Sequence, residues 1–226
     1  AVARTGQMGV VSGTGIDTVF VRRLQDGDRG GHMRRGIEQF PIRRAADEAI
    51  RRYYRPEGRA PGEPYTMLPM YRQVVAPARQ ELTMLATFVE VFLAKDGHDA
   101  PVGINLLTKV QMLTLPTLYG AMLAGVDYVL MGAGIPREIA GALDLLAGHH
   151  PARLRFDVDG LPSDAVEYLK FDPSAHWETP PAPLARPKFL PIVASNSLAK
   201  MLARKATGQV DGFVIEGPTA GGHNAP

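Results

Sequence analysis

Four short segments of the chain are continuously apolar, and their spacing limits the folds that the chain can adopt. They are residues 102–107 (VGINLL), 128–131 (YVLM), 189–194 (FLPIVA) and 212–215 (GFVI). Strands that are apolar on both faces are typical of parallel sheets covered by helices, because a strand with one solvated face alternates. Residues 8–15 (MGVVSGTG) have the same character, and residues 65–70 (YTMLPM) form a weaker sixth candidate.

Helical patterns lie between these segments, at residues 80–94, 113–124, 136–147 and 197–206. Proline at the start of the third pattern and glycines after the last three are typical helix boundaries. The second strand candidate begins 26 residues after the first, and the fourth begins 23 after the third. Each interval matches one βα unit of a (β/α)₈ barrel. Strand, helix, strand, helix is therefore the expected order.

This order predicts an α/β fold, a (β/α)₈ TIM barrel of which about the first six strands are present. Residues 1–226 would then form a single barrel domain that is incomplete at its C-terminus, and we expect the natural chain to continue by about 100 residues or more. An open, doubly wound sheet is the alternative. Residues 149–187 contain seven prolines and predict a surface insertion with a short strand at 154–158. Residues 24–64 predict short helices packed over a barrel end.

Composition excludes several kinds of chemistry. The chain has no cysteine, so it has neither disulfides nor a thiolate nucleophile. Its longest apolar run has thirteen residues, 82–94, fewer than the roughly 20 that a membrane span needs. A cytoplasmic protein without a membrane partner is expected. The adjacent pair His149 and His150 follows a helix and is predicted to be exposed, and the histidines show no metal-ligand spacing, so no protein metal site is expected.

Arginine is concentrated in the first 60 residues, which hold twelve Arg and no Lys. A solvated helical surface is the favoured interpretation, and a patch that binds an anion or a partner is the alternative. Only Tyr53 and Tyr54 accompany these arginines as aromatic residues beside them. Nucleic-acid surfaces combine clustered charge with aromatic or motif support, so no nucleic-acid partner is expected.

The residues that could perform chemistry follow the predicted strands, at the carboxyl ends where (β/α)₈ enzymes build their active sites. Ser12, Gly13 and Thr14 could let a ligand approach the backbone, or they could form an ordinary turn. Asn105 is an amide inside an apolar strand, so it either bridges structure or contacts a ligand. The third and later strands are followed by Gly132, by Ser195, which could cap a helix, and by Gly221, Gly222 and His223. A histidine in such a position could take a proton near neutral pH.

Taken in order and spacing, four stretches resemble the nitronate monooxygenase family, formerly called 2-nitropropane dioxygenases. They are residues 102–105 (VGIN), 129–134 (VLMGAG), 192–195 (IVAS) and 211–223 (DGFVIEGPTAGGH). That family is similar in fold and flavin use to the FMN-dependent enoyl-acyl-carrier-protein reductases. The resemblance covers roughly residues 8–15 and 100–226, and the AGGH tetrapeptide is its most specific part.

The resemblance implies a barrel that binds FMN at its C-terminal mouth and oxidises a nitronate or nitroalkane with oxygen to a carbonyl compound and nitrite. Ser12, Gly13, Thr14, Asn105, Gly132, Ser195, Gly221 and Gly222 would bind the cofactor. His223 would be the general base or the residue that orients the substrate. An enoyl-thioester reductase that uses NAD(P)H, or a barrel-derived binding protein without catalysis, are the alternatives. A small-molecule substrate and oxygen are the expected partners, and self-association into a homo-oligomer is left open.

Overall fold

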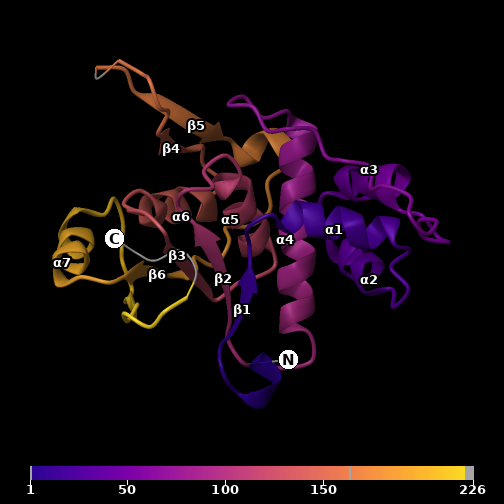
Figure 1. Ribbon diagram of the computed structural model, residues 1–226, viewed down its shortest axis with the longest axis horizontal. Helices are drawn as coiled ribbons and strands as arrows, with labels where there is room; N and C mark the ends of the chain where they lie inside the picture. The colour runs from indigo at the N-terminus through magenta and orange to yellow at the C-terminus, as the bar shows by residue number, and fades with distance from the viewer. Residues whose placement is uncertain (1, 163, 222–226) are drawn as a thin grey trace.

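A five-stranded parallel sheet, curled into a half-barrel, is the centre of the molecule (Figure 1). The computed structural model describes residues 2–162 and 164–221. The strands are β1 (Gly9–Ser12), β2 (Val102–Leu107), β3 (Tyr128–Gly132), β6 (Lys188–Val193) and β7 (Val214–Ile215), and they lie side by side in this order. The α/β prediction is confirmed to this extent, and β2 has the predicted bounds. Residues 65–70, the weaker candidate, belong to no strand.

The register brings the strand ends predicted to carry function to one edge of the sheet. Ser12 of β1 pairs with Asn105 of β2, and Asn105 pairs with Leu130 of β3. Further along, Leu107 pairs with Gly132, the last residue of β3. Because all these pairs are parallel, the carboxyl ends of the strands and the loops that follow them share one side, which we call the mouth.

Helices cover the convex face of the sheet. They are α4 (Pro77–Lys95), α5 (Thr114–Leu123), α6 (Ile139–Ala147) and α7 (Asn196–Lys205). Val102, Ile104 and Leu106 of β2 point toward this layer and are 0%, 0% and 5% exposed. The opposite face of β2, with Gly103, Asn105 and Leu107, is the concave face. Within the described residues, no helix is long and apolar enough to span a membrane.

Three short helices precede α4 in the chain and pack against it: α1 (Ile16–Gln25), α2 (His32–Gln39) and α3 (Arg43–Tyr53). The expected short helices are therefore present, but their predicted place over a barrel end is wrong. They lie on the side of α4 that faces away from the sheet (Figure 1). Helix α4 is consequently buried on both sides, from Glu81 to Val89 and again at Val91.

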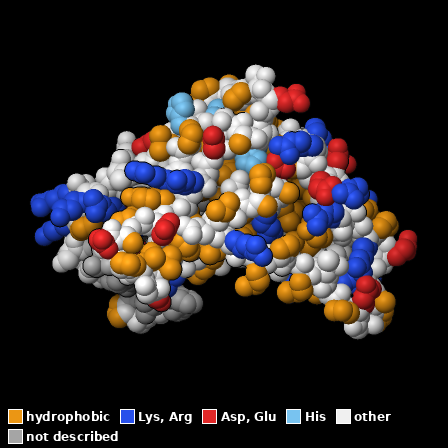
Figure 2. All heavy atoms as spheres, turned by 90° about the horizontal axis from the view of Figure 1, so that it is seen from above, with side chains coloured by type: hydrophobic (Ala, Val, Ile, Leu, Met, Phe, Trp, Pro, Cys, Tyr) orange, Lys and Arg blue, Asp and Glu red, His pale blue; other side chains and the backbone are white. Residues whose placement is uncertain are grey.

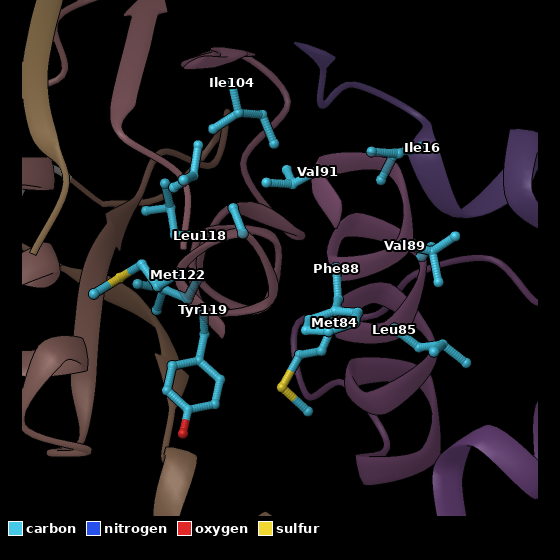
Figure 3. Close-up of a cluster of buried hydrophobic side chains, with 14 of the residues drawn as sticks. Ile16, Met84, Leu85, Phe88, Val89, Val91, Ile104, Leu118, Tyr119 and Met122 are labelled. Atoms are coloured by element: carbon cyan, nitrogen blue, oxygen red, sulfur yellow. The ribbon is translucent and has the colours of Figure 1, made fainter. Parts of the chain in front are cut away.

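The core is densest where α4 crosses α5. In Figure 3, Met84 of α4 points toward Tyr119 of α5, whereas Leu85 and Val89 point toward the N-terminal helices. Gly120 permits this approach, because a Cβ atom there would lie 2.3 Å from the backbone oxygen of Met84. A larger residue would push the two helices apart.

The proline-rich insertion is more ordered than the sequence predicts. It contains β4 (Ala152–Phe156) and β5 (Glu167–Phe171), which form an antiparallel hairpin, and the short 3₁₀ helix η2 (Pro173–His176). The predicted strand at 154–158 is thus shifted to 152–156 and has a partner. One hairpin face is buried, through Ala152, Leu154, Leu169 and Phe171. The insertion therefore adds to the core as well as to the surface.

Candidate functional site

Asn105 is the predicted site residue with the most informative surroundings. Its side chain lies on the concave face of β2, next to Ser12 in the register, while its backbone oxygen accepts a hydrogen bond from Gly13 N at 2.8 Å. Its side-chain oxygen Oδ1 is buried and has no hydrogen-bond partner among the described residues. A buried acceptor without a partner loses its hydration and gains nothing in return, which costs about 1–3 kcal/mol. Such an atom marks a place where a ligand or water donates a hydrogen bond.

The small residues after β1 divide into two groups. Ser12 and Thr14 are exposed, and both line an open cleft of about 1050 Å³ between β1, α1, α2 and α4. Gly13 is buried, and a Cβ atom there would lie 3.1 Å from the backbone oxygen of Asn105 and from Ile104 Cδ1. Gly13 is therefore required by packing against β2, whereas the two hydroxyls remain accessible.

Glu90 of α4 lines the same cleft. Burial raises the pKa of its carboxyl group, and the ion pair with Arg23 only partly offsets this effect. A carboxyl group with a perturbed pKa in a cleft is a candidate functional residue. Sequence reasoning gave no signal for it, because Glu90 is one polar residue inside an apolar helix.

Gly132 and Ser195 have structural roles in the described chain. A Cβ atom on Gly132 would lie 2.9 Å from Ile192 Cβ on the neighbouring β6, so the glycine makes room for that strand. Ser195 is the N-cap of α7, and its Oγ accepts a hydrogen bond from Leu198 N at 3.3 Å. This is the capping role that the sequence left open. Gly221 is exposed, and a Cβ atom there would have no described atom within 4 Å, whereas Gly222 and His223 lie outside the described residues.

The hairpin forms a wall beside the mouth, a feature that sequence reasoning missed. Gln111, after β2, donates from Nε2 to Asp157 O at 3.1 Å and accepts from Asp157 N at 3.0 Å. Glu138, after β3, accepts from Arg155 N at 2.7 Å. A cleft of about 460 Å³ lies between these loops and the hairpin, and the exposed side chains of Ile135 and Val166 are among its lining. The alternation in ARLRF and EYLKF was the available signal for the two strands.

Two histidines in the insertion are buried in polar networks. The prediction that His149 is exposed is wrong, since it is 7% exposed and has a left-handed backbone with φ of 58°. Trp177 donates to the hydroxyl of Tyr119 at 2.8 Å, so that hydroxyl donates to His149 Nδ1 at 2.7 Å. His149 Nε2 then donates to Ala182 O at 3.1 Å.

His176 forms the second network. Its Nδ1 lies 2.9 Å from a Glu81 carboxylate oxygen, and its Nε2 lies 3.1 Å from Gln80 Oε1. Arg44 forms an ion pair with the same carboxylate at 2.6 Å. Burial alone would raise the pKa of Glu81, but the hydrogen bonds from His176 and Arg44 outweigh it and lower that pKa. Among the described residues, no cluster of three or more His, Asp or Glu side chains could hold a metal ion.

The arginines of the N-terminal region mostly serve internal ion pairs. Nine of the twelve pair with a carboxylate: Arg23–Glu90, Arg34–Asp28, Arg35–Asp96, Arg43–Asp47, Arg44–Glu81, Arg51–Glu48, Arg52–Glu48, Arg55–Glu63 and Arg59–Asp26. Figure 2 shows basic and acidic side chains interleaved over the part of the molecule that holds α1–α3. This pattern supports the solvated-surface interpretation for most of the region.

Comparison with models of known protein families, with curated proteins and with solved structures found no match to the chain.

Proposed function

We propose that the protein is an FMN-dependent oxidoreductase of the nitronate monooxygenase type, with its cofactor at the mouth of the half-barrel. The observation that supports this most directly is the buried, unpartnered Oδ1 of Asn105 on the concave face, near the carboxyl ends of the strands. The flavin ring system has an N–H group that could donate to such an oxygen. Strand ends of this kind are where (β/α)₈ enzymes bind their ligands.

The residues present fit one part of the cofactor. The amide of Asn105 would hold the polar edge of the flavin ring, and the hydroxyl of Ser12, one strand away in register, would lie beside it. The backbone at Gly221 is exposed and has no described atom close to a Cβ position, so it would let the ring lie close to the chain. Gly13, Gly132 and Ser195 would shape the site without contacting the cofactor, because protein atoms already occupy the space next to each of them.

FMN would supply the redox chemistry when bound. The chain would position the substrate and manage its proton. His223 would take the α-proton of a neutral nitroalkane on an imidazole nitrogen, or would orient a nitronate that is already ionised. With oxygen as the final acceptor, the products would be a carbonyl compound and nitrite. The cleft beside the hairpin would hold the part of the substrate that does not react.

The first test is binding of FMN to the purified protein, followed by fluorescence quenching of the flavin. Asn105→Leu should weaken FMN binding more than tenfold, the loss of one hydrogen bond in a site shielded from water. The same change should leave thermal stability equal or higher, because it removes an unpaired buried oxygen. Thr117→Val is the matched control, since Thr117 Oγ1 is also buried without a partner but belongs to α5. It should leave FMN affinity unchanged.

The outcomes separate the alternatives. A protein that stays colourless and quenches no flavin fluorescence would rule out the flavoenzyme and favour a non-catalytic binding protein. Unchanged FMN affinity in Asn105→Leu would remove Asn105 from the site. If flavin binds, oxygen uptake with a nitronate supports the monooxygenase, whereas NAD(P)H oxidation with an enoyl thioester supports the reductase. His223→Ala should retain flavin and lose most turnover.

A further inference from the structure

A third cleft, away from the mouth, is lined by three arginines. It lies between the end of α3, the segment 69–76 and the beginning of α4, and its volume is about 630 Å³. Arg52, Arg72 and Arg79 line it, and none of its lining residues is Asp or Glu. We call it the arginine cleft. Arg79 and Arg52 have ion-pair partners, Asp17 and Glu48, that lie outside this lining, and Arg72 forms no ion pair with a described residue.

Arg79 is held in place by its neighbours, yet two of its guanidinium nitrogens have no hydrogen-bond partner among the described residues. Its Nη2 pairs with a carboxylate oxygen of Asp17 at 2.6 Å, and its guanidinium carbon lies 4.3 Å from the ring centroid of Tyr71. Tyr71 donates its hydroxyl to the same carboxylate. The Arg79 side chain is 11% exposed, and its Nε and Nη1 are buried without a partner among the described residues. Buried donors attached to a charge are costly to leave unpaired.

The other two arginines are paired with carboxylates less closely than Arg79 is, or not at all. Arg72 is exposed and forms no ion pair with any described residue. Arg52 lies 3.7 Å from Glu48, a carboxylate that also serves Arg51. Helix α4 begins here with no side-chain cap and no acidic residue in its first turn. The positive end of the helix dipole therefore adds to the field of the three guanidinium groups.

The remaining lining is apolar and aromatic. Tyr53 and Tyr71 contribute rings, and Met70 and Val74 of the adjoining segment are 91% and 87% exposed. A ligand for this cleft needs an anionic group for the arginines and a flat or apolar group for these side chains. Guanidinium groups bind phosphate through paired N–H donors, and the positive charge that Asp17 and Glu48 leave uncompensated favours an anion here.

We propose that the arginine cleft binds an organic phosphate, with the phosphoryl group among Arg52, Arg72 and Arg79 and the organic part against Tyr53 and Tyr71. The site is separate from the proposed flavin site, because the cleft lies at α3 and the start of α4 whereas Asn105 is on the concave face of the sheet. The proposal goes beyond the anion-binding alternative left open for residues 1–60, because only Arg52 of the three arginines belongs to that range.

Phenyl phosphate is the probe, titrated by calorimetry into the full chain in a phosphate-free buffer. We expect saturable binding, and Arg72→Gln and Arg52→Gln should each weaken it about tenfold, the loss of one charge-assisted contact. Arg29→Gln is the charge-matched control, since Arg29 forms no ion pair with a described residue and does not line this cleft. It should leave the affinity unchanged. Arg72 is exposed, so its variant should fold, and circular dichroism checks this.

Several results would overturn or refine the proposal. Absence of saturable binding overturns it, and so does equal weakening by Arg72→Gln and Arg29→Gln, because binding would then depend on net charge alone. Equal affinity for inorganic phosphate also overturns it, because the two tyrosine rings would then add nothing to the binding of the phosphoryl group. Phenol should not bind. Asn105→Leu should bind phenyl phosphate normally, so failure of the flavin proposal leaves this one standing, and the reverse also holds.

Discussion

Replacement of Tyr119 by phenylalanine tests whether the insertion is held to the core by the buried hydroxyl. That hydroxyl accepts a hydrogen bond from Trp177 and donates one to His149. Without it, one indole N–H and one imidazole nitrogen lose their partner. Each unpaired buried group costs about 1–3 kcal/mol, and because Trp177 is only half-buried we expect a total loss of about 2 kcal/mol in the free energy of unfolding. For a chain of this length, that corresponds to about 4–8 °C in Tm.

The assay uses the fact that Trp177 is the sole tryptophan of the chain. Urea unfolding is followed both by its fluorescence and by circular dichroism at a helical wavelength. Tyr128→Phe is the control, because it removes the same atom from a tyrosine whose hydroxyl has no hydrogen bond to a described residue. It should change stability by less than about 0.5 kcal/mol. If Tyr119→Phe costs no more than Tyr128→Phe, the network does not hold the insertion.

The pH dependence of the free energy of unfolding tests independently whether the Tyr119 hydroxyl is buried. Burial raises the pKa of Tyr119 to about 12, although the hydrogen bond from Trp177 acts in the opposite direction. The folded pKa lies above the unfolded one, so the stabilisation is fully present below about pH 10 and is lost as the pH rises toward 12. The wild type should therefore lose stability between these values faster than Tyr119→Phe. Parallel curves would contradict the burial of this hydroxyl.

Two further changes test the packing around α4. Glu81→Gln should cost about 1–3 kcal/mol at neutral pH, since it removes a buried carboxylate that is hydrogen-bonded to His176 and Arg44, whereas Glu48→Gln at the surface should cost under about 1 kcal/mol. Because the pKa of Glu81 is lowered in the folded state, its contribution is present above about pH 4.5 and is lost as the pH falls, so urea titrations of the two variants should converge in acid. Gly120→Ala should cost about 3 kcal/mol or prevent folding, because its Cβ would collide with the backbone of Met84. Near-normal Tm in this variant would contradict the close helix crossing.

The sequence was a good guide where a segment is buried on both faces and a poor one where structure depends on distant partners. The bounds of β2 were predicted because every residue except Asn105 is apolar, which leaves few alternatives. The hairpin was missed because its prolines suggested loops and its strands alternate over only five residues each. Residues 65–70 resemble a strand locally but pair with no strand in the described part of the chain.

In the candidate site, too, local features could be predicted from the sequence and features that depend on distant residues could not. The position of Asn105 at the mouth followed from strand order alone, whereas the absence of a partner for its Oδ1 depends on what β1 and β3 place around it. Ser195 is a helix cap, one of the two roles that its position allowed. The buried state of His149 depends on Tyr119, which is 30 residues earlier, and on Trp177, so no local pattern revealed it.

The burial of α4 on both sides has a consequence for how the molecule unfolds. Its residues from Glu81 to Val89 pack against the sheet layer on one side and against α1–α3 on the other. If either layer detached, α4 would expose a strip of apolar surface, and the other layer would lose part of its support. The N-terminal helices and the half-barrel therefore form a single cooperative unit. A cleavage between α3 and α4 would weaken the sheet even though it removes none of the strands β2, β3, β6 and β7.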